Sequence, residues 1–301
     1  GSGIAITCMA VLGFFGNLSM GFINRLDQKT QTIAQGSFDR SPLQAEWNPS
    51  RLNCPNESCL IGVKNKKKPK YALIGNSHAD HLAHSLNREL ISRGLTAYAF
   101  AFNGCQPVDF DEKSSHFTNN ECFEKILKFL NEEKQVKTII VSFRWTSAIT
   151  GIGFGDENKK PVTNLDLNII KERGSIIARK IEELIGDHRN LLLVYPIPEP
   201  GRDVPNYIAK YRMLKDENFE LTIPVDVFQR RNIATYTALD SISSPSRIVR
   251  IYPSKVFCDE NSNGICRTVI KGKSLYFDDN HLSTFGASLI APVITAELPI
   301  R

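Results

Sequence analysis

The hydrophobic pattern after residue 70 alternates between short apolar runs and longer segments with helical spacing. The apolar runs predict buried strands at Tyr71–Ile74, Thr96–Phe102, Thr138–Phe143, Leu191–Tyr195 and Ile248–Tyr252. The periodic segments predict helices at His78–Ser92, Cys122–Leu130, Leu167–Ile185, Val225–Ser241 and Thr284–Ala296. Strands that alternate with helices predict an α/β domain, in which helices cover both faces of a mainly parallel sheet.

The first 60 residues do not follow this pattern. Ile4 to Phe15 is an apolar stretch of 12 residues without a charge, which is too short to span a bilayer. It is either the trailing end of a transmembrane helix or a helix that packs on the domain itself. Residues 16–60 are polar and irregular, and we expect them to form a linking extension. The main domain then covers residues 61–301.

Composition and charge describe an ordinary globular protein. The chain has 301 residues, of which 42% are hydrophobic and 23% charged. A net charge of +5 is mild and predicts no nucleic-acid partner. The basic run Lys64–Lys70 has two interpretations: a solvated loop before the first core strand, or a site for phosphate or anionic lipid.

Six of the seven cysteines fall into close pairs. The pairs are Cys54/Cys59, Cys105/Cys122 and Cys258/Cys266, and Cys8 lies in the apolar stretch. Local pairs with turn residues between them favour disulfides and an oxidising, exported compartment. A zinc site is the alternative, but the ligand spacing that it requires is missing.

The candidate chemistry rests on two distant segments. Ser77 follows the first strand and a Gly turn, and His281 follows Asp278 by three residues. A nucleophilic Ser needs a base, and the base needs an orienting carboxylate. The spacing favours Asp278 over its neighbour Asp279 for that task. Taken alone, Ser77 could equally be a helix N-cap.

Three further histidines show helical spacing. His78, His81 and His84 could suggest a metal site, but no matching Asp, Glu or Cys set accompanies them, so the sequence predicts no metal. We expect His78 to pack beside the nucleophile. Parallel sheets gather functional residues at the carboxyl ends of their strands. Ser77, Gly104 and Arg144-Trp145 all lie just past such ends.

Both segments resemble the motifs of one enzyme family, the SGNH/GDSL hydrolases. Gly75-Asn76-Ser77-His78 resembles their first block, normally Gly-Asp-Ser, and Asp278-x-x-His281 is similar to their last. The resemblance covers roughly residues 70–298 and implies an SGNH-like three-layer α/β/α fold. It also implies a Ser77–His281–Asp278 triad, with an oxyanion hole formed by the N–H groups of Ser77 and Gly104. Gly104 could instead be an ordinary turn glycine. A Cys105–Cys122 disulfide would brace its loop.

The third block departs from the family pattern. These enzymes usually supply an Asn as a further oxyanion donor, but here Arg144-Trp145 follows the strand. That pattern is similar to SGNH domains fused behind membrane acyltransferase-3 domains. The resemblance implies a substrate or oxyanion region at Asn76, His78, Arg144 and Trp145. Losing one donor typically costs about 10²–10³-fold in rate, so we expect the isolated domain to be a slow esterase.

The resemblance to such fusions implies an O-acetyltransferase that acts on a surface polysaccharide, most of all lipopolysaccharide O-antigen. An N-terminal acyltransferase-3 membrane domain of the same chain would bring acetyl groups from cytoplasmic acetyl-CoA. The SGNH domain would then face the periplasm at the inner membrane and hold no cofactor of its own. One alternative is an exported carbohydrate acetyl esterase with the same triad. A second alternative is a non-catalytic glycan-binding module, for which Ser77→Ala would leave function intact.

Overall fold

A six-stranded sheet forms the centre of the protein in the computed structural model, which describes residues 2–18, 23–45, 59–64, 68–111, 116–154, 167–259 and 264–299. The strand order is β1-β3-β2-β6-β7-β9. The bounds are β1 Leu60–Gly62, β2 Tyr71–Gly75, β3 Thr96–Ala101, β6 Thr138–Ser142, β7 Asn190–Val194 and β9 Ile248–Ile251. Neighbouring strands are parallel except β1, which pairs antiparallel with β3. The predicted mainly parallel sheet is therefore confirmed.

The sheet is buried on both faces because successive side chains of a strand point in opposite directions. In β2, Ala72 and Ile74 join one hydrophobic cluster, whereas Leu73 joins the other. In β6, Ile139 and Ile140 divide between the two clusters in the same way. This explains why the core strands appear in the sequence as continuous apolar runs.

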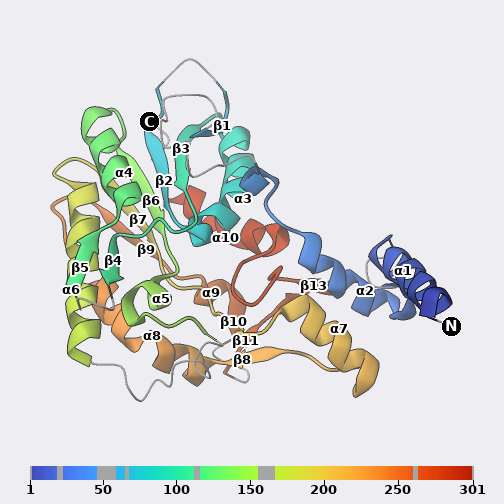
Figure 1. Ribbon diagram of the computed structural model, residues 1–301. Coiled ribbons are helices and arrows are strands. Elements are labelled where there is room, and N and C mark those ends of the chain that lie inside the picture. Colours follow the sequence, from blue (N-terminus) through green and yellow to red (C-terminus); the bar gives the residue numbers. More distant parts are fainter. Residues whose placement is uncertain are drawn as a thin grey trace.

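Helices cover the two faces and complete three layers (Figure 1). One face carries α3 (Ser77–Ser92) and α10 (Thr284–Ala296), which pack against each other. The other carries α4 (Glu121–Glu132), α5 (Trp145–Thr150), α6 (Leu167–Ile185) and α8 (Val225–Asp240). The sequence pattern did not predict the short helix α5 or α7 (Val204–Leu214).

Small antiparallel sheets and two disulfides surround this centre. The pairs are β4 (Val108–Asp111) with β5 (His116–Asn119), β11 (Ile265–Arg267) with both β8 (Thr222–Pro224) and β10 (Cys258–Asp259), and β12 (Val269–Ile270) with β13 (Lys273–Ser274). The turn α9 (Ser254–Phe257) precedes β10. Disulfides join Cys105 to Cys122 and Cys258 to Cys266, as predicted. Cys54 lies outside the described residues, so the Cys54–Cys59 pairing stays a prediction.

The extension before the domain is more ordered than predicted. It forms α2 (Gln28–Ala34) and the short 3-10 helices η1 (Ile23–Arg25), η2 (Gln35–Phe38) and η3 (Pro42–Ala45), so the expectation of an irregular segment is wrong here. Asp27 caps α2 by accepting hydrogen bonds from the N–H groups of Lys29 and Thr30. Helix α2 packs along α7, and Ile33 enters the domain core. Its buried side is too narrow to produce a clear apolar period.

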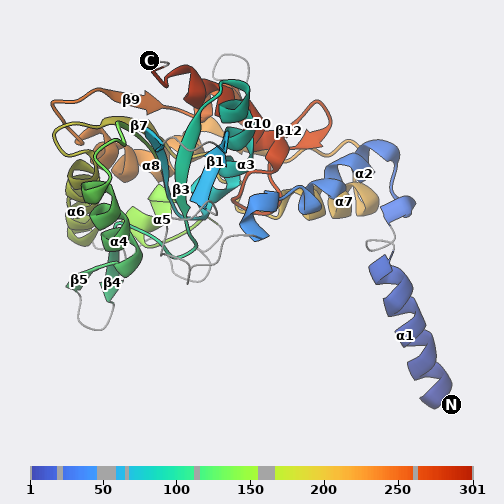
Figure 2. The ribbon, with the colours of Figure 1, turned by 90° about the horizontal axis from the view of Figure 1, so that it is seen from above.

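Helix α1 (Ser2–Leu18) projects away from the domain (Figures 1 and 2). Its apolar side chains are exposed, among them Ile4 at 75% and Met9 at 65%. The described residues contain no helix whose length and apolar character would let it cross a membrane. Whether α1 continues a membrane segment stays a prediction.

Candidate active site

Ser77 stands at the junction of strand β2 and helix α3. A Cβ atom at Gly75 would lie 1.7 Å from the carbonyl oxygen of Ser142, so only glycine lets the ends of β2 and β6 approach this closely. Asn76 then caps α3, because its Oδ1 accepts from the N–H of His78 at 3.0 Å. Ser77 is the first residue of the helix, where backbone N–H groups have no partner within the helix. Its N–H is therefore left without a partner inside the helix, and its role as an oxyanion donor stays a prediction.

The structure brings Ser77, His281 and Asp278 together in one hydrogen-bonded chain. The Nε2 atom of His281 lies 2.8 Å from the Oγ of Ser77. The Nδ1 atom of His281 lies 2.8 Å from Oδ2 of Asp278. When Nδ1 carries the proton and donates to the carboxylate, Nε2 is free to accept the proton of the Ser77 hydroxyl. This geometry can deprotonate a nucleophilic serine.

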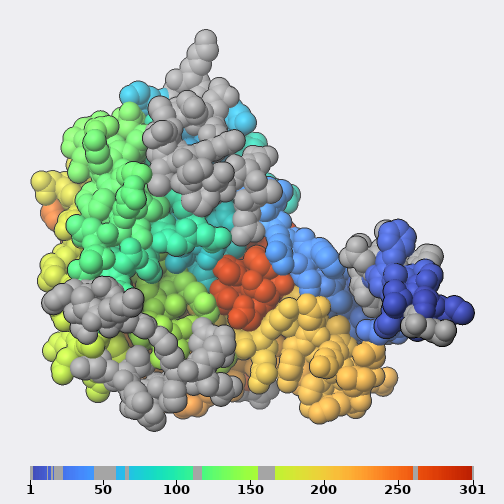
Figure 3. Space-filling model, viewed as in Figure 1, coloured from blue at the N-terminus to red at the C-terminus, as the bar shows by residue number. Residues whose placement is uncertain are grey.

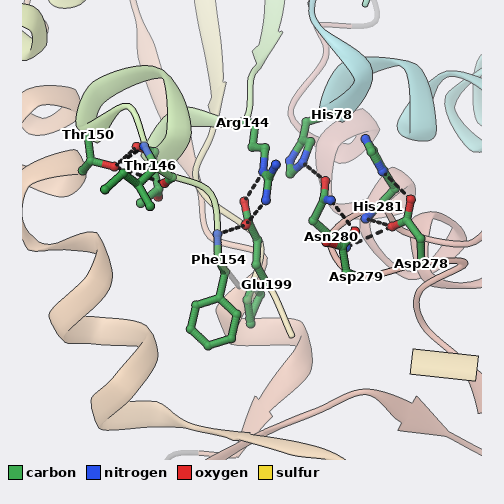
Figure 4. Close-up of polar contacts among 12 residues, drawn as sticks. His78, Arg144, Thr146, Thr150, Phe154, Glu199, Asp278, Asp279, Asn280 and His281 are labelled. Atoms are coloured by element: carbon green, nitrogen blue, oxygen red, sulfur yellow. Dashed lines mark hydrogen bonds and ion pairs between the residues drawn. The ribbon is translucent and has the colours of Figure 1, made fainter. Parts of the chain in front are cut away.

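The loop before α10 fixes the carboxylate of this chain. Oδ1 of Asp278 accepts from the N–H groups of Asn280 at 2.9 Å and His281 at 2.7 Å (Figure 4). Burial alone would raise the pKa of Asp278, but the hydrogen bond from His281 and its charge outweigh it and hold that pKa below its usual range. Asp279 accepts instead from the side chain of Asn280 at 2.7 Å. Asp278, and not Asp279, therefore orients His281.

Three buried ionisable residues of α3 lie behind His281. The ring of His78 packs edge-on at 5.3 Å from that of His281, and its Nε2 lies 3.1 Å from Oδ1 of Asn280. Burial lowers the pKa of His78 to about 3, and it lowers the pKa of His81 well below its usual value. Burial raises the pKa of Asp80 to about 7. His78 and His81 are thus neutral at pH 7, and neither competes with His281 for the Asp278 carboxylate. Among the residues that the structure describes, no group of three His, Cys, Asp or Glu could hold a metal ion.

Arg144 contacts Asn76, the residue before Ser77, and is paired with an acid that the sequence analysis missed. Its Nε and Nη2 donate to the two carboxylate oxygens of Glu199, at 3.1 and 2.8 Å (Figure 4). The N–H of Phe154 also donates to Glu199 at 3.3 Å. Burial would raise the pKa of Glu199, but the hydrogen bonds and charge of Arg144 lower it. The pair is therefore a charged, bidentate contact.

Asn76 connects the two sides of the site. Its Oδ1 accepts from the backbone N–H of Arg144 at 3.1 Å as well as from His78. The side chain thereby ties the end of β2 to the end of β6. Both of these bonds end on a side-chain oxygen, and an Asp side chain carries the same oxygen. The Asp that is usual in Gly-Asp-Ser and the Asn found here can therefore fill the same structural role.

Trp145 belongs to the core. Its side chain is 1% exposed, and its indole N–H donates to the carbonyl of Val194 at 2.7 Å. The ring also packs edge-on against Phe143. Of the predicted Arg144-Trp145 unit, Arg144 therefore stands beside the site, whereas Trp145 anchors α5 beneath it.

Gly104 lies in a braced turn after β3. It adopts a left-handed conformation with a φ of 77°, which favours glycine. The side chain of Asn120 donates to its carbonyl at 3.2 Å, and the adjacent Cys105 is bonded to Cys122 of α4. These contacts hold the turn against α4. The oxyanion role of Gly104 stays a prediction.

One wide cleft among the described residues does not contain the candidate triad. It has a volume of about 1100 Å³ and is lined by residues of α2, α7, α9, β8 and β10 to β12. Ser77, Asp278 and His281 are absent from its walls. The side chains of His281 and Asp278 are instead 21% and 28% exposed. The triad is therefore reached from the molecular surface and not through this cleft.

Comparisons with known proteins bear on the family and the fold of the chain. A family model described as an SGNH domain fused to AT3 domains matches residues 44–296. A lipopolysaccharide acetyltransferase periplasmic domain from Salmonella ser. Paratyphi A has a TM-score of 0.50 and 16% identity over 77% of this chain and 84% of its own, which shows a common fold. A carbohydrate acetylesterase family member from Sinorhizobium meliloti has a TM-score of 0.37 and 13% identity over 76% of this chain and 98% of its own. Among curated proteins, no sequence matches this chain.

Proposed function

Because the chain belongs to the SGNH domains that are fused to AT3 domains, we propose that it transfers an acetyl group to a hydroxyl of a bacterial surface polysaccharide. Lipopolysaccharide O-antigen is the acceptor we favour. The observation that carries this proposal is the unbroken chain from Ser77 through His281 to Asp278, with both links at 2.8 Å. Nucleophile, base and orienting carboxylate are in contact before any substrate arrives.

In the first half-reaction the hydroxyl of Ser77 attacks the carbonyl carbon of the acetyl donor. His281 takes the hydroxyl proton at Nε2, and Asp278 stabilises the imidazolium that results. The tetrahedral oxyanion forms where the N–H of Ser77 points, at the start of α3. Collapse of this intermediate breaks the bond to the donor group, which leaves with the proton from His281. An acetyl ester on Ser77 remains.

In the second half-reaction a sugar hydroxyl replaces the donor group. His281, again neutral, removes the proton of that hydroxyl while its oxygen attacks the acetyl carbon. A second tetrahedral intermediate collapses, the bond from the acetyl carbon to the Ser77 oxygen breaks, and His281 returns its proton to that oxygen, which releases Ser77 and the acetylated sugar. Water could follow the same route and would release acetate. The partial exposure of His281 at the molecular surface supports an acceptor that is one residue of a long chain.

The acetyl supply in this proposal is a membrane domain in the same polypeptide. The family description names AT3 domains as the fusion partner. We propose that this partner passes acetyl groups from cytoplasmic acetyl-CoA to Ser77 on the periplasmic face of the inner membrane. The two disulfides support an oxidising compartment. No cofactor is required in the SGNH domain itself.

The test compares the full-length protein with the SGNH domain alone in cells that make the polysaccharide. Glycan-bound acetate is measured for the wild type and for Ser77→Ala of the full-length protein. We expect acetylation only from the full-length wild type. Equal acetylation by the domain alone would contradict the membrane relay, and full acetylation by Ser77→Ala would contradict the role of Ser77. If the domain instead strips acetate from the glycan, the exported esterase becomes the better description.

A further inference from the structure

The extension before the domain reaches the candidate active site. Asp39, which follows η2, accepts from the N–H of Phe285 at 3.0 Å and from the hydroxyl of Thr284. Its carbonyl accepts from the N–H of Thr284 at 3.0 Å. These bonds cap the first turn of α10, the helix that directly follows the His281 loop, and a carboxylate is favoured there by the helix dipole. Figure 3 shows the two segments side by side on the surface.

This anchor places Arg40 over the catalytic loop. The guanidinium carbon of Arg40 lies 5.0 Å from the ring centre of Phe277. The same ring is stacked on the imidazole of His281, with ring centres 5.3 Å apart and an angle of 4° between the planes. The guanidinium of an extension residue and the catalytic imidazole thus both pack on one phenyl ring.

Arg40 is a cation with spare donors. Its side chain is exposed, and its Nε donates to the carbonyl of Ser37 at 3.3 Å. Within the part of the chain that the structure describes, its two terminal nitrogens have no hydrogen-bond or ion-pair partner. The nearest carboxylate in sequence, Asp39, is occupied by α10. Asp279 is bonded to Asn280 and, through its carbonyl, to Gly201.

We propose that Arg40 forms an anion subsite that selects acceptor glycans carrying a carboxylate or phosphate group near the acetylated hydroxyl. A guanidinium presents paired donors that match both groups. Its stacking on Phe277 preorients those donors beside the base, so less conformational entropy is lost on binding. This inference rests on the proposed function, because it concerns the acceptor of that same site.

Direct binding tests the subsite independently of catalysis. Oligogalacturonate serves as the carboxylate probe, glucose 6-phosphate as the phosphate probe, and a neutral galactose oligomer as the reference. Titration calorimetry at low salt is run on the wild type, Arg40→Gln, Arg40→Lys and Lys215→Gln. Lys215 is the matched control, because its ammonium also lies 5.0 Å from an aromatic ring, that of Tyr211, but outside the site.

We expect the wild type to bind an anionic probe more tightly than the neutral reference. Arg40→Gln should weaken that binding by about tenfold, which corresponds to the loss of one charge-assisted contact. Arg40→Lys should retain part of it, and Lys215→Gln all of it. If Arg40→Gln loses affinity for oligogalacturonate, the acceptor carries a uronate. If it loses affinity for the sugar phosphate, the acceptor is phosphorylated. Equal binding of anionic and neutral probes, or an unchanged anion affinity in Arg40→Gln, overturns the subsite.

The result is separable from that of the proposed function. Ser77→Ala should bind the probes as the wild type does, because Ser77 is not a ligand of the anion. Loss of acetylation in Ser77→Ala together with unchanged anion affinity in Arg40→Gln would leave the transferase proposal intact and remove the subsite alone. Tight binding that depends on Arg40, together with acetylation that does not depend on Ser77, would leave the subsite intact and remove the transferase proposal.

Discussion

The two sides of the candidate active site are built in different ways. The base side, comprising Ser77 and the Asp278–His281 loop, uses hydrogen bonds within that loop and one contact from the loop to the start of α3. The arginine side, comprising Arg144, Phe154 and Glu199, depends on a largely buried ion pair between residues 55 apart in sequence. Both meet at Asn76, which accepts from His78 and from Arg144.

This difference in construction corresponds to a difference in role: the base side contains the candidate reacting groups, and the arginine side supports them. The base side contains each group that a serine nucleophile needs, and its carboxylate is held ionised by His281. On the arginine side, the carboxylate of Glu199 accepts from Arg144 and from the N–H of Phe154. The cation of that side already has a carboxylate partner, so its task is to hold the end of β6 and to shape the surface that a substrate meets. Substitutions on the two sides should therefore fail in different ways.

The largest expected effect separates two adjacent acids. Asp278→Asn should reduce hydrolysis of a small acetyl ester by about 10⁴-fold, because an amide there favours the wrong imidazole tautomer. Asp279→Asn should change the rate by less than about twofold, since Asp279 has no contact with His281 in the bonds described. Steady-state kinetics of both variants provide the test. Comparable losses in the two would contradict the assignment of Asp278.

A smaller effect on rate, but a large one on stability, is expected on the arginine side. Glu199→Gln leaves Arg144 without its charged partner in a mostly buried place, which should lower the free energy of unfolding by about 3 kcal/mol. The exposed pair Arg247–Glu297 is the matched control, and Glu297→Gln should cost less than about 1 kcal/mol. Chemical denaturation measures both. Equal costs would show that the Arg144 pair contributes no more than a surface contact.

The smallest expected effect is a pH dependence of stability that arises behind the base side. His78 and His81 stay neutral in the native state, whereas in the unfolded chain they take up protons below about pH 6.5. Unfolding therefore becomes easier as the pH falls from about 6.5. Asp80 has the opposite effect on stability. Burial raises its pKa to about 7 in the native state, so below that pH the native state holds a proton that the unfolded chain has lost.

The balance of these three groups gives a slope that can be measured. Among these three groups, two histidines against one aspartic acid leave about one net proton, which contributes about 1.4 kcal/mol of stability lost per pH unit between pH 6 and 5. Asp80→Asn removes the opposing group and should steepen the measured slope by about the same amount. Denaturant unfolding at several pH values provides the test. An unchanged slope in Asp80→Asn would show that Asp80 is ionised in the native state.

The sequence predicted the strands and the two segments of the base side for the same physical reason, which is that each of them is a local pattern; the contact between Ser77 and His281 is not local. Buried strands such as Thr138–Ser142 are continuous apolar runs, and Asp278 and His281 share one short loop. Ser77 follows a Gly that the strand end requires. These features are encoded within a few residues, so they can be found without knowledge of the fold.

The parts that could not be predicted depend on long-range contacts. Glu199 lies in a proline-rich segment after β7, and only the fold brings it to Arg144. The one available signal was its position past the end of a parallel strand. Asp39 and Arg40 lie in a polar extension, and only the fold brings them into contact with α10 and Phe277, which are more than 200 residues away in sequence. Helix α2 was missed because few of its residues are buried.

The most direct test of the account is to find the acetyl group on Ser77. The domain is mixed with an activated acetyl ester, quenched in acid within the first turnover, digested and analysed by mass spectrometry. We predict one acetyl group on the peptide that contains Ser77 in the wild type, its loss in Ser77→Ala, and its release when an acceptor glycan is added before the quench. An unmodified Ser77 during active turnover, or an acetyl group that persists in Ser77→Ala, would contradict the central claim.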